Sequence, residues 1–498
     1  MSSKSYIQIP RTSRFAIVGA GPAGVHFAHL LAKQGFNNIT VLEADDHVGG
    51  KSFTVTEGNI PYDMGTVLLT TSTYGPVFDL LENEDPENKP VPFPDSPKKN
   101  YCVIMGSSQT GVSDKDNKTF TDRRVWSLKQ TMLDSVPAFL RPITPLMFPG
   151  IKILLAARRY RALHEKIFGG KFKYGMPPSP PSDWSLLNMT ALQFLEKHRL
   201  KALIAMFRIS VQLNGYGVLE SIPAFYAIWW MHPDLVDQSC RAHLQKKPIL
   251  FGTSKGFQHL WETIAAKLSV EKGVKFLVNA PVSKVTRHPD STATVEYTQN
   301  GILGNLDVDY VVMAVDLSKY VNIIPKLTSV ESKLFTTQYT SSVYASTLYK
   351  SDPGPFEFPM EMFPDRMTPI AKFDESAGNF GHCHTYRNAR LMLRPRPDKG
   401  NVTWGPDALG RQQRVAYQFL DRPLQDAVIE AKNFTQKLRG DFEIAGHSNV
   451  EIKVQKTWNY FPRFTQQGLI EEIPWKIKEI QGDTNTFWLG SSLTISNL

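Results

Sequence analysis

Three glycines near the start of the sequence have the spacing of a turn that binds a dinucleotide. Gly19, Gly21 and Gly24 follow an apolar segment and open a helical one, and Glu43 closes the next apolar segment. The first glycine permits the tight turn, the second lets the backbone approach a pyrophosphate, and the third allows close packing of helix on strand. The helix N-terminus supplies N–H donors, and an acid about 20 residues further on can bind ribose hydroxyls. A glycine turn without a ligand is the alternative, and Glu43 argues against it.

A second glycine pair favours FAD over NAD as the dinucleotide. The segment GGKS (49–52) comes shortly after Glu43, and PYDMGTVLL (61–69) follows it. This order resembles the flavin amine oxidase superfamily, in which a Gly-Gly-Arg-x-Ser/Thr turn adds a phosphate contact and an Asp-x-Gly segment runs under the isoalloxazine. Lys51 replaces the usual Arg, which keeps the positive charge but loses the bidentate fork.

Three later segments resemble the same superfamily in the expected order. SKGFQHLWETIAAKL (254–268) resembles its Gly-x-x-x-Leu helix, DYVVMAV (309–315) its returning strand, and TFWLGSS (486–492) its late Phe-x-Gly turn. In the superfamily a glutamate and a helix follow this turn, and this sequence ends at Leu498, about where that helix is expected to begin. The resemblance implies FAD as the cofactor. The cofactor-binding residues that it implies are Gly19, Gly21, Pro22, Ala23, Gly24, Glu43, Ala44, Gly50, Lys51, Met64, Gly65, Thr66, Val282, Gly490 and Ser491.

Two segments differ from the amine oxidases of this superfamily, which carry a Lys that hydrogen-bonds a water at flavin N5. The corresponding region, YTSSVYASTLYK (339–350), has a Lys only at its end, and a late Trp segment has become KTWNYFPRF (456–464). Together with GGKS and NGYGVLESIPAFY (214–226), the Tyr-Phe-Pro of this late segment resembles the polyunsaturated fatty acid isomerases and their relatives. The resemblance implies an enzyme that acts on a small lipid and moves a double bond.

The implied reaction requires a hydride acceptor, aromatic walls and a cation for the substrate carboxylate. A carbon between two double bonds can give a hydride to N5 of oxidised flavin, and return of the hydride to the far end of the pentadienyl system leaves a conjugated diene. We predict Tyr216 and Tyr226 as catalytic residues, and Arg208, Arg463 and Phe461 as substrate-binding residues. The alternatives are that the aromatic residues pack a helical core and that each Arg forms a surface salt bridge.

Two other functions stay open at this point. One is an FAD-dependent oxidase of amines or amino acids that releases peroxide, and the other is a flavin-bound protein without turnover. His382 and His384 flank Cys383, but no third ligand is evident, so the sequence predicts no metal site.

The elements that position these residues predict an α/β flavoprotein of two interleaved domains. Strands are expected at 14–20, 38–44, 274–278 and 309–315, a helix at 22–34, and several helices between 125 and 250. We predict a Rossmann-like FAD-binding domain from residues 1–120, 251–325 and 451–498. A mixed sheet and a helical cap, from residues 121–250 and 326–450, form the predicted substrate-binding domain.

Composition excludes several other classes of protein. The 498 residues are 42% hydrophobic and 21% charged, which indicates a globular fold, and three cysteines without paired spacing indicate a cytoplasmic or other reducing compartment. We expect no signal peptide and no transmembrane segment.

The net charge is +9, but the sequence has no nucleic-acid-binding signatures. We interpret Arg158, Arg159 and Arg161 as a solvated basic face, with contact to a membrane surface as the alternative. The sequence does not indicate an oligomeric state.

Overall fold

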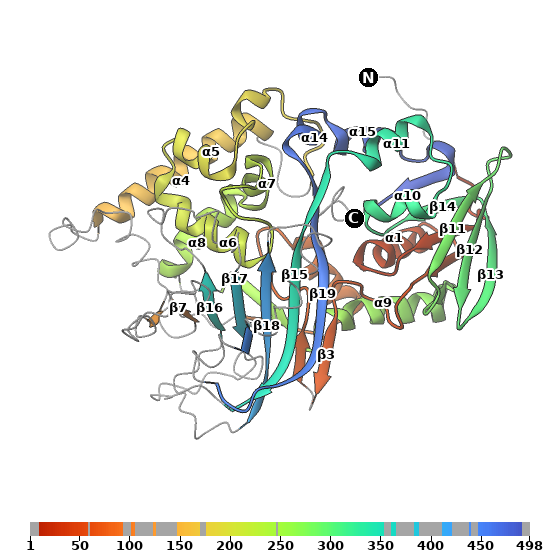
Figure 1. Cartoon of the computed structure of the whole chain (residues 1–498), viewed down its shortest axis with the longest axis horizontal. Helices are drawn as coiled ribbons and strands as arrows, with labels where there is room; N and C mark the ends of the chain where they lie inside the picture. The colour runs from red at the N-terminus through yellow and green to blue at the C-terminus, as the bar shows by residue number, and fades with distance from the viewer. Residues whose placement is uncertain are drawn as a thin grey trace.

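A five-stranded parallel sheet carries the first glycine turn (Figure 1). The computed structural model describes residues 9–57, 60–92, 101–104, 123–125, 147–169, 176–245, 248–352, 360–364, 383–387, 411–420, 438–439 and 447–490. In spatial order, the strands of the parallel sheet are β10 (Lys275–Leu277), β2 (Ile39–Leu42), β1 (Phe15–Val18), β14 (Tyr310–Met313) and β20 (Thr486–Trp488). The first four of these strands were expected, apart from their exact ends, because strands of parallel sheets have continuous apolar sequences. β20 was not expected, since its segment was interpreted only as a glycine turn.

The parallel sheet is covered by helices on one face and by a smaller sheet on the other. Helices α1 (Pro22–Lys33) and α9 (Phe257–Lys272) share a hydrophobic cluster with Phe15 and Ile17 of β1. The intervening Ala16 and Val18 belong to the cluster that includes the three-stranded antiparallel sheet β11 (Val282–Arg287), β12 (Ala293–Gln299) and β13 (Ile302–Val308). The alternation of β1 side chains therefore joins the two layers.

A seven-stranded mixed sheet forms the second large element of the molecule. Its spatial order is β19 (Glu451–Phe464), β15 (Tyr339–Ser351), β18 (Gln412–Leu420), β17 (Cys383–Arg387), β16 (Met360–Pro364), β7 (Tyr101–Ile104) and β8 (Arg123–Val125). The sequence-based division grouped β7 and β19 with the nucleotide-binding domain, whereas in the structure both are strands of this seven-stranded sheet. The domain boundaries themselves stay a prediction. β7 pairs with β16, and β19 pairs along almost the whole of β15. Such pairing between distant segments leaves no local signal.

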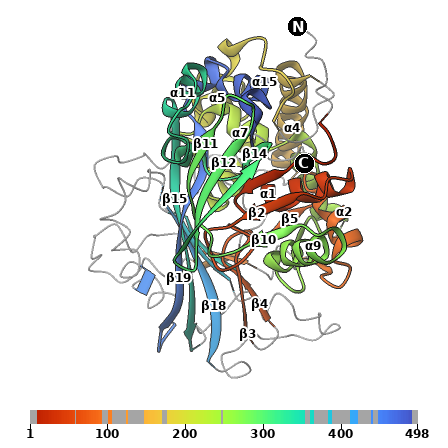
Figure 2. The same ribbon diagram turned by 90° about the vertical axis from the view of Figure 1, so that its right-hand side faces the viewer.

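Short strands and helices connect the two large sheets (Figure 2). The strands are β3 (Thr54–Glu57), β4 (Ile60–Asp63), β5 (Leu69–Thr70), β6 (Pro90–Pro92) and β9 (Leu250–Thr253). The α-helices are α2 (Gly75–Glu84), α10 (Tyr320–Ile323), α11 (Ser329–Thr336), α14 (Gln466–Ile470) and α15 (Ile473–Glu479). The 3-10 helices are η3 (Trp184–Leu186), η4 (Lys201–Leu203), η5 (Leu317–Lys319) and η8 (Asp483–Asn485).

Five further helices gather beside one end of β15 and β19, at the upper left of Figure 1. They are α4 (Met147–Phe168), α5 (Ala191–Lys197), α6 (Ile204–Leu213), α7 (Ala224–Trp230) and α8 (Pro233–Gln245). They match the helical region expected between residues 125 and 250. Within the described residues, no helix has the length and apolar character needed to cross a membrane.

Hydrogen bonds from the seven-stranded sheet fix the β3–β4 hairpin. The Tyr417 hydroxyl donates to the Asp63 carbonyl at 2.5 Å, and Trp458 Nε1 donates to the Met64 carbonyl at 3.3 Å. Tyr62 and Met64 also pack in one hydrophobic cluster with Tyr417. The segment after β4, which we expect under a flavin ring, is thus held by the seven-stranded sheet.

A buried ion pair joins the three-stranded sheet to α11. Arg287 donates two hydrogen bonds to the Glu331 carboxylate at 2.7 and 2.8 Å, and a third to the Lys326 carbonyl at 2.7 Å. Burial by itself would raise the pKa of Glu331, but hydrogen bonds from Arg287 and Thr328 hold it below its usual value. The carboxylate form is therefore the one that stabilises the fold.

We expect Glu331→Gln to lower the free energy of unfolding by about 3 kcal/mol at neutral pH, because the change leaves the Arg287 charge buried. A carboxyl with a lowered pKa contributes its stability above its usual pKa of 4.5 and loses it as the pH falls through the lowered value. Urea unfolding at neutral and acidic pH should thus show the variant and the wild type converging in acid. The matched control is Glu296→Gln, which breaks the exposed pair with Lys284 and should cost under about 1 kcal/mol. A gap that persists unchanged in acid would contradict this account of the pair.

Candidate functional site

The first glycine turn lies at the carboxyl ends of the parallel strands. Gly19 follows β1 with a φ of +103°, and a Cβ there would lie 2.9 Å from the Ala314 carbonyl oxygen, just after β14. Gly24 stands in the first turn of α1, where a Cβ would lie 2.0 Å from the Gly19 carbonyl oxygen. Because ligands of open α/β sheets bind outside the carboxyl ends of the strands, the turn has the position that a dinucleotide needs.

The N-terminus of α1 is open to an anion. Gly21 is the N-cap and offers no side chain to the first N–H groups, while Pro22 at the first helical position has no N–H of its own. Ala23 and Gly24 follow in this first turn. The N-terminus of a helix carries partial positive charge and unpaired donors, so this end fits a pyrophosphate.

The second glycine turn packs directly against the first. The Gly49 N–H donates to the Ala20 carbonyl at 2.9 Å. Gly50 has a φ of +51°, and a Cβ there would lie 3.0 Å from the Cα of Gly21. The two turns thus meet through backbone atoms, and only glycine allows this approach.

The segment at Met64–Thr66 is held against the second turn. The Thr66 N–H donates to the Lys51 carbonyl at 3.0 Å, and the Ser52 and Thr66 hydroxyls lie 3.1 Å apart. A Cβ on Gly65 would lie 1.7 Å from the Lys51 carbonyl oxygen. The predicted phosphate turn and the predicted flavin segment therefore form one rigid unit.

Glu43 lies beside the first turn with both carboxylate oxygens engaged. Oε2 accepts a hydrogen bond from the Ala20 N–H at 2.7 Å, and Oε1 accepts one from the Asp45 N–H at 3.0 Å. A carboxylate can accept more than two hydrogen bonds, so these contacts leave acceptor sites on Glu43 for ribose hydroxyls. The ribose contact of Glu43 stays a prediction. The Ala280 N–H donates to the Glu43 carbonyl at 2.7 Å, which brings the chain before Val282 beside Glu43 and Ala44.

The late glycine turn closes the same edge. Gly490 has a φ of +144°, and the preceding Leu489 N–H donates to the Met313 carbonyl at 2.8 Å. Ser491, also predicted to bind the cofactor, lies outside the described residues. At the described glycines of these turns a side chain would take up the space beside the backbone. Without side chains, the turns together leave room for an extended dinucleotide.

Lys51 connects the glycine turns with a group of aromatic residues. Its ammonium lies 5.9 Å from the centre of the Tyr460 ring. Burial lowers the pKa of Lys51, nearby Asp316 raises it, and Lys319 lowers it further, so that the pKa lies below its usual value. The predicted phosphate contact of Lys51 is untested, but its charge is close to both parts of the candidate site.

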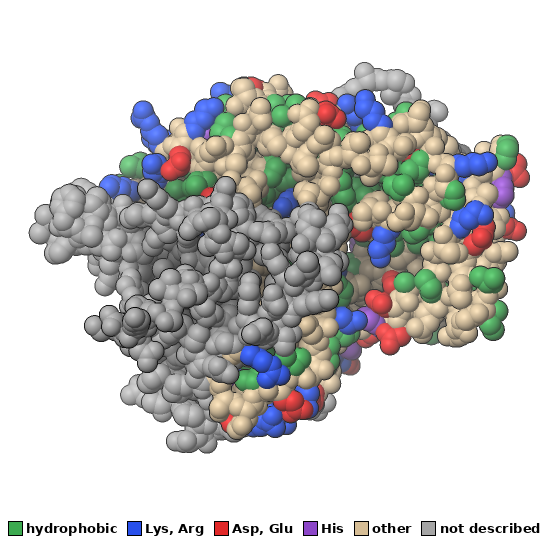
Figure 3. Space-filling model, viewed as in Figure 1, with side chains coloured by type: hydrophobic (Ala, Val, Ile, Leu, Met, Phe, Trp, Pro, Cys, Tyr) green, Lys and Arg blue, Asp and Glu red, His purple; other side chains and the backbone are tan. Residues whose placement is uncertain are grey.

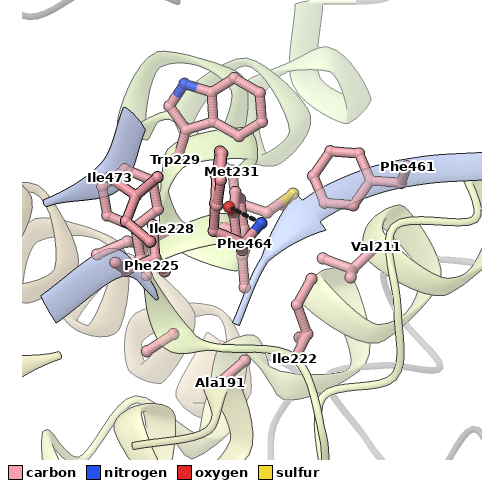
Figure 4. Packing of buried hydrophobic residues seen from close by; sticks show 14 of the residues in the cluster. Ala191, Val211, Ile222, Phe225, Ile228, Trp229, Met231, Phe461, Phe464 and Ile473 are labelled. Carbon is pink, nitrogen blue, oxygen red and sulfur yellow. Dashed lines mark hydrogen bonds between the residues drawn. The ribbon is translucent and has the colours of Figure 1, made fainter. Parts of the chain in front are cut away.

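Six aromatic side chains from three segments meet at the start of β15 and the end of β19. This aromatic cluster consists of Tyr216, Tyr226, Trp229, Trp230, Tyr460 and Phe461. The Tyr216 ring lies 4.4 Å from that of Trp230 and 4.6 Å from that of Phe461. Trp229 stacks on Phe461 at 6.3 Å, and Figure 4 shows these two side chains approaching from α7 and β19 with Met231 between them.

The buried tyrosines of the cluster are neutral hydrogen-bonding groups. Burial raises the pKa of Tyr216 well above its usual value, and neighbouring Tyr74 and Tyr460 raise it further. Burial likewise raises the pKa of Tyr74 to about 12. At physiological pH these phenols keep their protons, so they can donate hydrogen bonds and line a wall but cannot serve as bases.

Tyr226 differs from Tyr216 in its contacts. Its hydroxyl accepts a hydrogen bond from the Phe464 N–H at 2.9 Å, drawn as a dashed line in Figure 4. Its ring lies 5.4 Å from that of Phe461. These contacts join α7 to the end of β19, so the structure supplies a packing role for Tyr226, and its predicted catalytic role is untested.

The two predicted arginine anchors have different surroundings. Arg208 is buried and forms a bidentate pair with Glu220, with N–O distances of 2.5 and 3.0 Å. Arg463 donates to the Ser342 hydroxyl at 2.9 Å, and its guanidinium carbon lies 5.9 Å from the Phe461 ring centre. Glu220 balances the charge of Arg208, and Arg463 lies against the Phe461 ring, so Arg463 contacts the aromatic cluster directly.

Sequence reasoning missed Tyr74 and Tyr344 as neighbours of this cluster. Tyr344 lies in the middle of β15, with its ring 4.8 Å from that of Tyr460. Gly215, at a φ of +73°, brings the chain so close that a Cβ would lie 2.7 Å from the Tyr344 ring. Lys350 pairs with Glu451 at the far end of β15, about 20 Å from Tyr344, so the register keeps it away from the cluster.

The histidines considered as metal ligands are only partly described. His382 lies outside the described residues, and of His384 only the place in β17 is known. Among the residues that the structure does describe, no three His, Cys, Asp or Glu side chains gather as a metal site.

Comparisons with known proteins agree with the geometry. The family described as flavin containing amine oxidoreductase matches residues 22–365. A polyenoic fatty acid isomerase of Ptilota filicina is 21% identical over 497 residues, which cover 96% of this chain and 90% of that protein. Over a shorter stretch of 95 residues, protoporphyrinogen oxidase 2 of Arabidopsis thaliana is 37% identical, covering 19% of this chain and 18% of that protein.

Solved structures share the fold over nearly the whole chain. The CLA-producing fatty acid isomerase from P. acnes superposes with a TM-score of 0.70 at 20% identity, covering 98% of this chain and 96% of that one. A putrescine oxidase superposes with a TM-score of 0.60 at 17% identity, covering 97% and 94% of the two chains. The α/β architecture predicted from the sequence is thereby confirmed.

We expect Gly24→Ala to weaken FAD binding about tenfold or more, because the added methyl group would displace the Gly19 carbonyl. Gly75→Ala is the matched control, since a Cβ at Gly75 meets nothing within 4 Å. The dissociation constant can be measured by titrating FAD into flavin-stripped protein. Equal affinities for the two variants would contradict the close approach at Gly24.

The affinity for FAD should fall in the alkaline range as Lys51 loses its proton. Because its pKa lies below the usual 10.5, the loss begins at a lower pH than for a free lysine. Lys51→Arg should keep the affinity constant over this range, since arginine stays protonated. FAD titrations of both proteins at several pH values provide the check. If the dissociation constants of the two proteins change with pH in the same way, the charge of Lys51 does not contribute to FAD binding.

Proposed function

This chain belongs to the flavin containing amine oxidoreductase family, and within it we propose that the chain is an FAD-dependent isomerase of polyunsaturated fatty acids. In this proposal the parallel sheet and its glycine turns hold FAD. The seven-stranded sheet and the helices α4–α8 hold the lipid, which lies against the aromatic cluster. When bound, FAD supplies a hydride acceptor and donor at N5, so that a double bond moves without net oxidation.

One observation carries the proposal: the aromatic cluster offers neutral ring faces with two cations beside them. Lys51 lies over the Tyr460 ring, and Arg463 lies over the Phe461 ring. Ring faces favour the delocalised positive charge that develops when a hydride leaves a carbon between two double bonds, so in this proposal the reacting carbons lie against rings of the cluster away from the two cations. Cations attract a carboxylate and repel a protonated amine, which favours a fatty acid as the substrate.

The chain's own residues have limited tasks in such a reaction. Tyr216 and Phe461 would hold the apolar chain and exclude water from the reacting carbons. Arg463 would pair with the carboxylate, with its Ser342 hydrogen bond fixing the direction of the guanidinium. The phenols keep their protons, and none of them has to act as a base. The full-length similarity to a polyenoic fatty acid isomerase supports the same reaction.

An FAD-dependent oxidase of amines or amino acids is the second candidate. The family itself and the shared fold of the putrescine oxidase favour it. That reaction would consume oxygen and release peroxide. The two candidates differ in whether oxygen is consumed.

The test mixes the FAD-loaded protein with a panel of polyunsaturated fatty acids under anaerobic conditions. We expect a rise in ultraviolet absorbance from a conjugated diene, without oxygen uptake when the assay is repeated in air. The parallel arm offers a panel of amines and follows peroxide. Peroxide without a diene would establish the oxidase instead. No diene, no peroxide and no flavin bleaching with any donor would indicate a flavin-bound protein without turnover.

A further inference from the structure

Helix α4 has one face that anchors it to the rest of the protein. The buried residues of this face include Ile153, Ala156, Ala157, Tyr160, His164 and Ile167. The Tyr160 hydroxyl lies 3.1 Å from the Ile228 carbonyl and 2.6 Å from the Met231 carbonyl, at the end of α7. Arg161 forms ion pairs with Asp234 and Asp237 of α8 at 2.7 and 2.5 Å. From the sequence, Arg161 was expected on a solvated basic face, but in the structure its charge is paired with these two carboxylates.

The opposite face of α4 exposes large aliphatic side chains. Ile151, Leu154 and Leu155 are 47%, 55% and 56% exposed. Their spacing of three and four residues places them side by side on the helix. The other large hydrophobic residues exposed in the described parts of the chain are scattered or lie at the β12–β13 turn. A group of neighbouring apolar side chains on a solvent-exposed surface indicates a site that binds another protein or a membrane.

Basic side chains surround this apolar patch. Lys152, Arg158, Arg159 and Lys166 are exposed on the same face, and Glu165 is the one acid in the sequence of α4. Figure 3 shows Lys and Arg side chains together with hydrophobic ones at the end of the molecule where α4 lies. The face of α4 therefore combines aliphatic groups with net positive charge.

We propose that this face of α4 docks on the surface of an anionic phospholipid membrane. A helix face that carries aliphatic residues between Lys and Arg can lie along such a surface, with its apolar side chains among the acyl chains. The basic residues complement anionic headgroups, and the net charge of +9 adds to the attraction.

The docking face lies one helix layer from the aromatic cluster. Tyr160, on the buried side of α4, contacts the carbonyls at the end of α7, and α7 carries Trp229 and Trp230. Docking would thus bring a membrane close to the helices that contribute to the candidate site. The inference itself rests on the surface of α4 and is independent of the proposed function.

The experiment sediments the FAD-loaded protein with vesicles of phosphatidylcholine, either pure or containing phosphatidylglycerol. We expect binding to the anionic vesicles to be about tenfold tighter or more, and to weaken as salt is added. The double variant with Leu154→Ser and Leu155→Ser, and the double variant with Arg158→Gln and Arg159→Gln, should each bind about tenfold more weakly or worse. Since these side chains are exposed, flavin absorbance and melting temperature should stay at wild-type values.

Matched control variants make the same changes elsewhere. Ile302→Ser with Leu303→Ser replaces two aliphatics that are 73% and 81% exposed, at the end of the molecule opposite α4 in Figure 1. Lys272→Gln with Lys275→Gln removes two exposed charges. Both controls should bind vesicles like the wild type. The proposal is wrong if the wild type does not sediment with anionic vesicles, or if the α4 variants do so equally well. Self-association that only the α4 variants lose, without vesicle binding, would identify a protein interface instead.

Discussion

The close approach of backbone segments at five glycines is the constraint on which the rest of the site depends. Gly24 meets the Gly19 carbonyl, Gly50 meets Gly21, and Gly65 meets the Lys51 carbonyl. Each contact leaves no room for a side chain, so the two phosphate turns and the segment after β4 have fixed relative positions. The N–H groups that point from them are then arranged before a ligand arrives, which lowers the entropic cost of binding.

The same contacts reach the second sheet. Tyr417 and Trp458 donate to the carbonyls of Asp63 and Met64, immediately before Gly65. Tyr460 follows Trp458 on β19, and its ring lies beneath the Lys51 ammonium. The nucleotide turns and the aromatic cluster are therefore parts of one packed structure. In the proposed function, a cofactor held by the first would thus be held at a defined position against the second, as transfer of a hydride would require.

Burial determines which of the polar groups can take part in chemistry. It keeps the phenols of Tyr216 and Tyr460 protonated and disfavours the charged form of Lys51. Glu220 neutralises Arg208, and Arg463 lies against Phe461. What results is an aromatic site in which the described phenols are poor bases. This suits a reaction whose difficult step belongs to a cofactor, and it suits an apolar substrate with an anionic end better than a protonated amine.

The sequence by itself determined the nucleotide turns, because their glycines, the N-terminus of α1 and Glu43 are local features with a fixed spacing. It also indicated the α/β class and the strands of the parallel sheet through continuous apolar segments. The tertiary structure alone decided that β19 pairs with β15, that Tyr74 lies near Tyr216 and Tyr344 near Tyr460, and that Glu220 forms an ion pair with Arg208. The physical reason is that backbone conformation follows from neighbouring residues, whereas pairing, burial and the charge of a side chain depend on segments that only folding brings together.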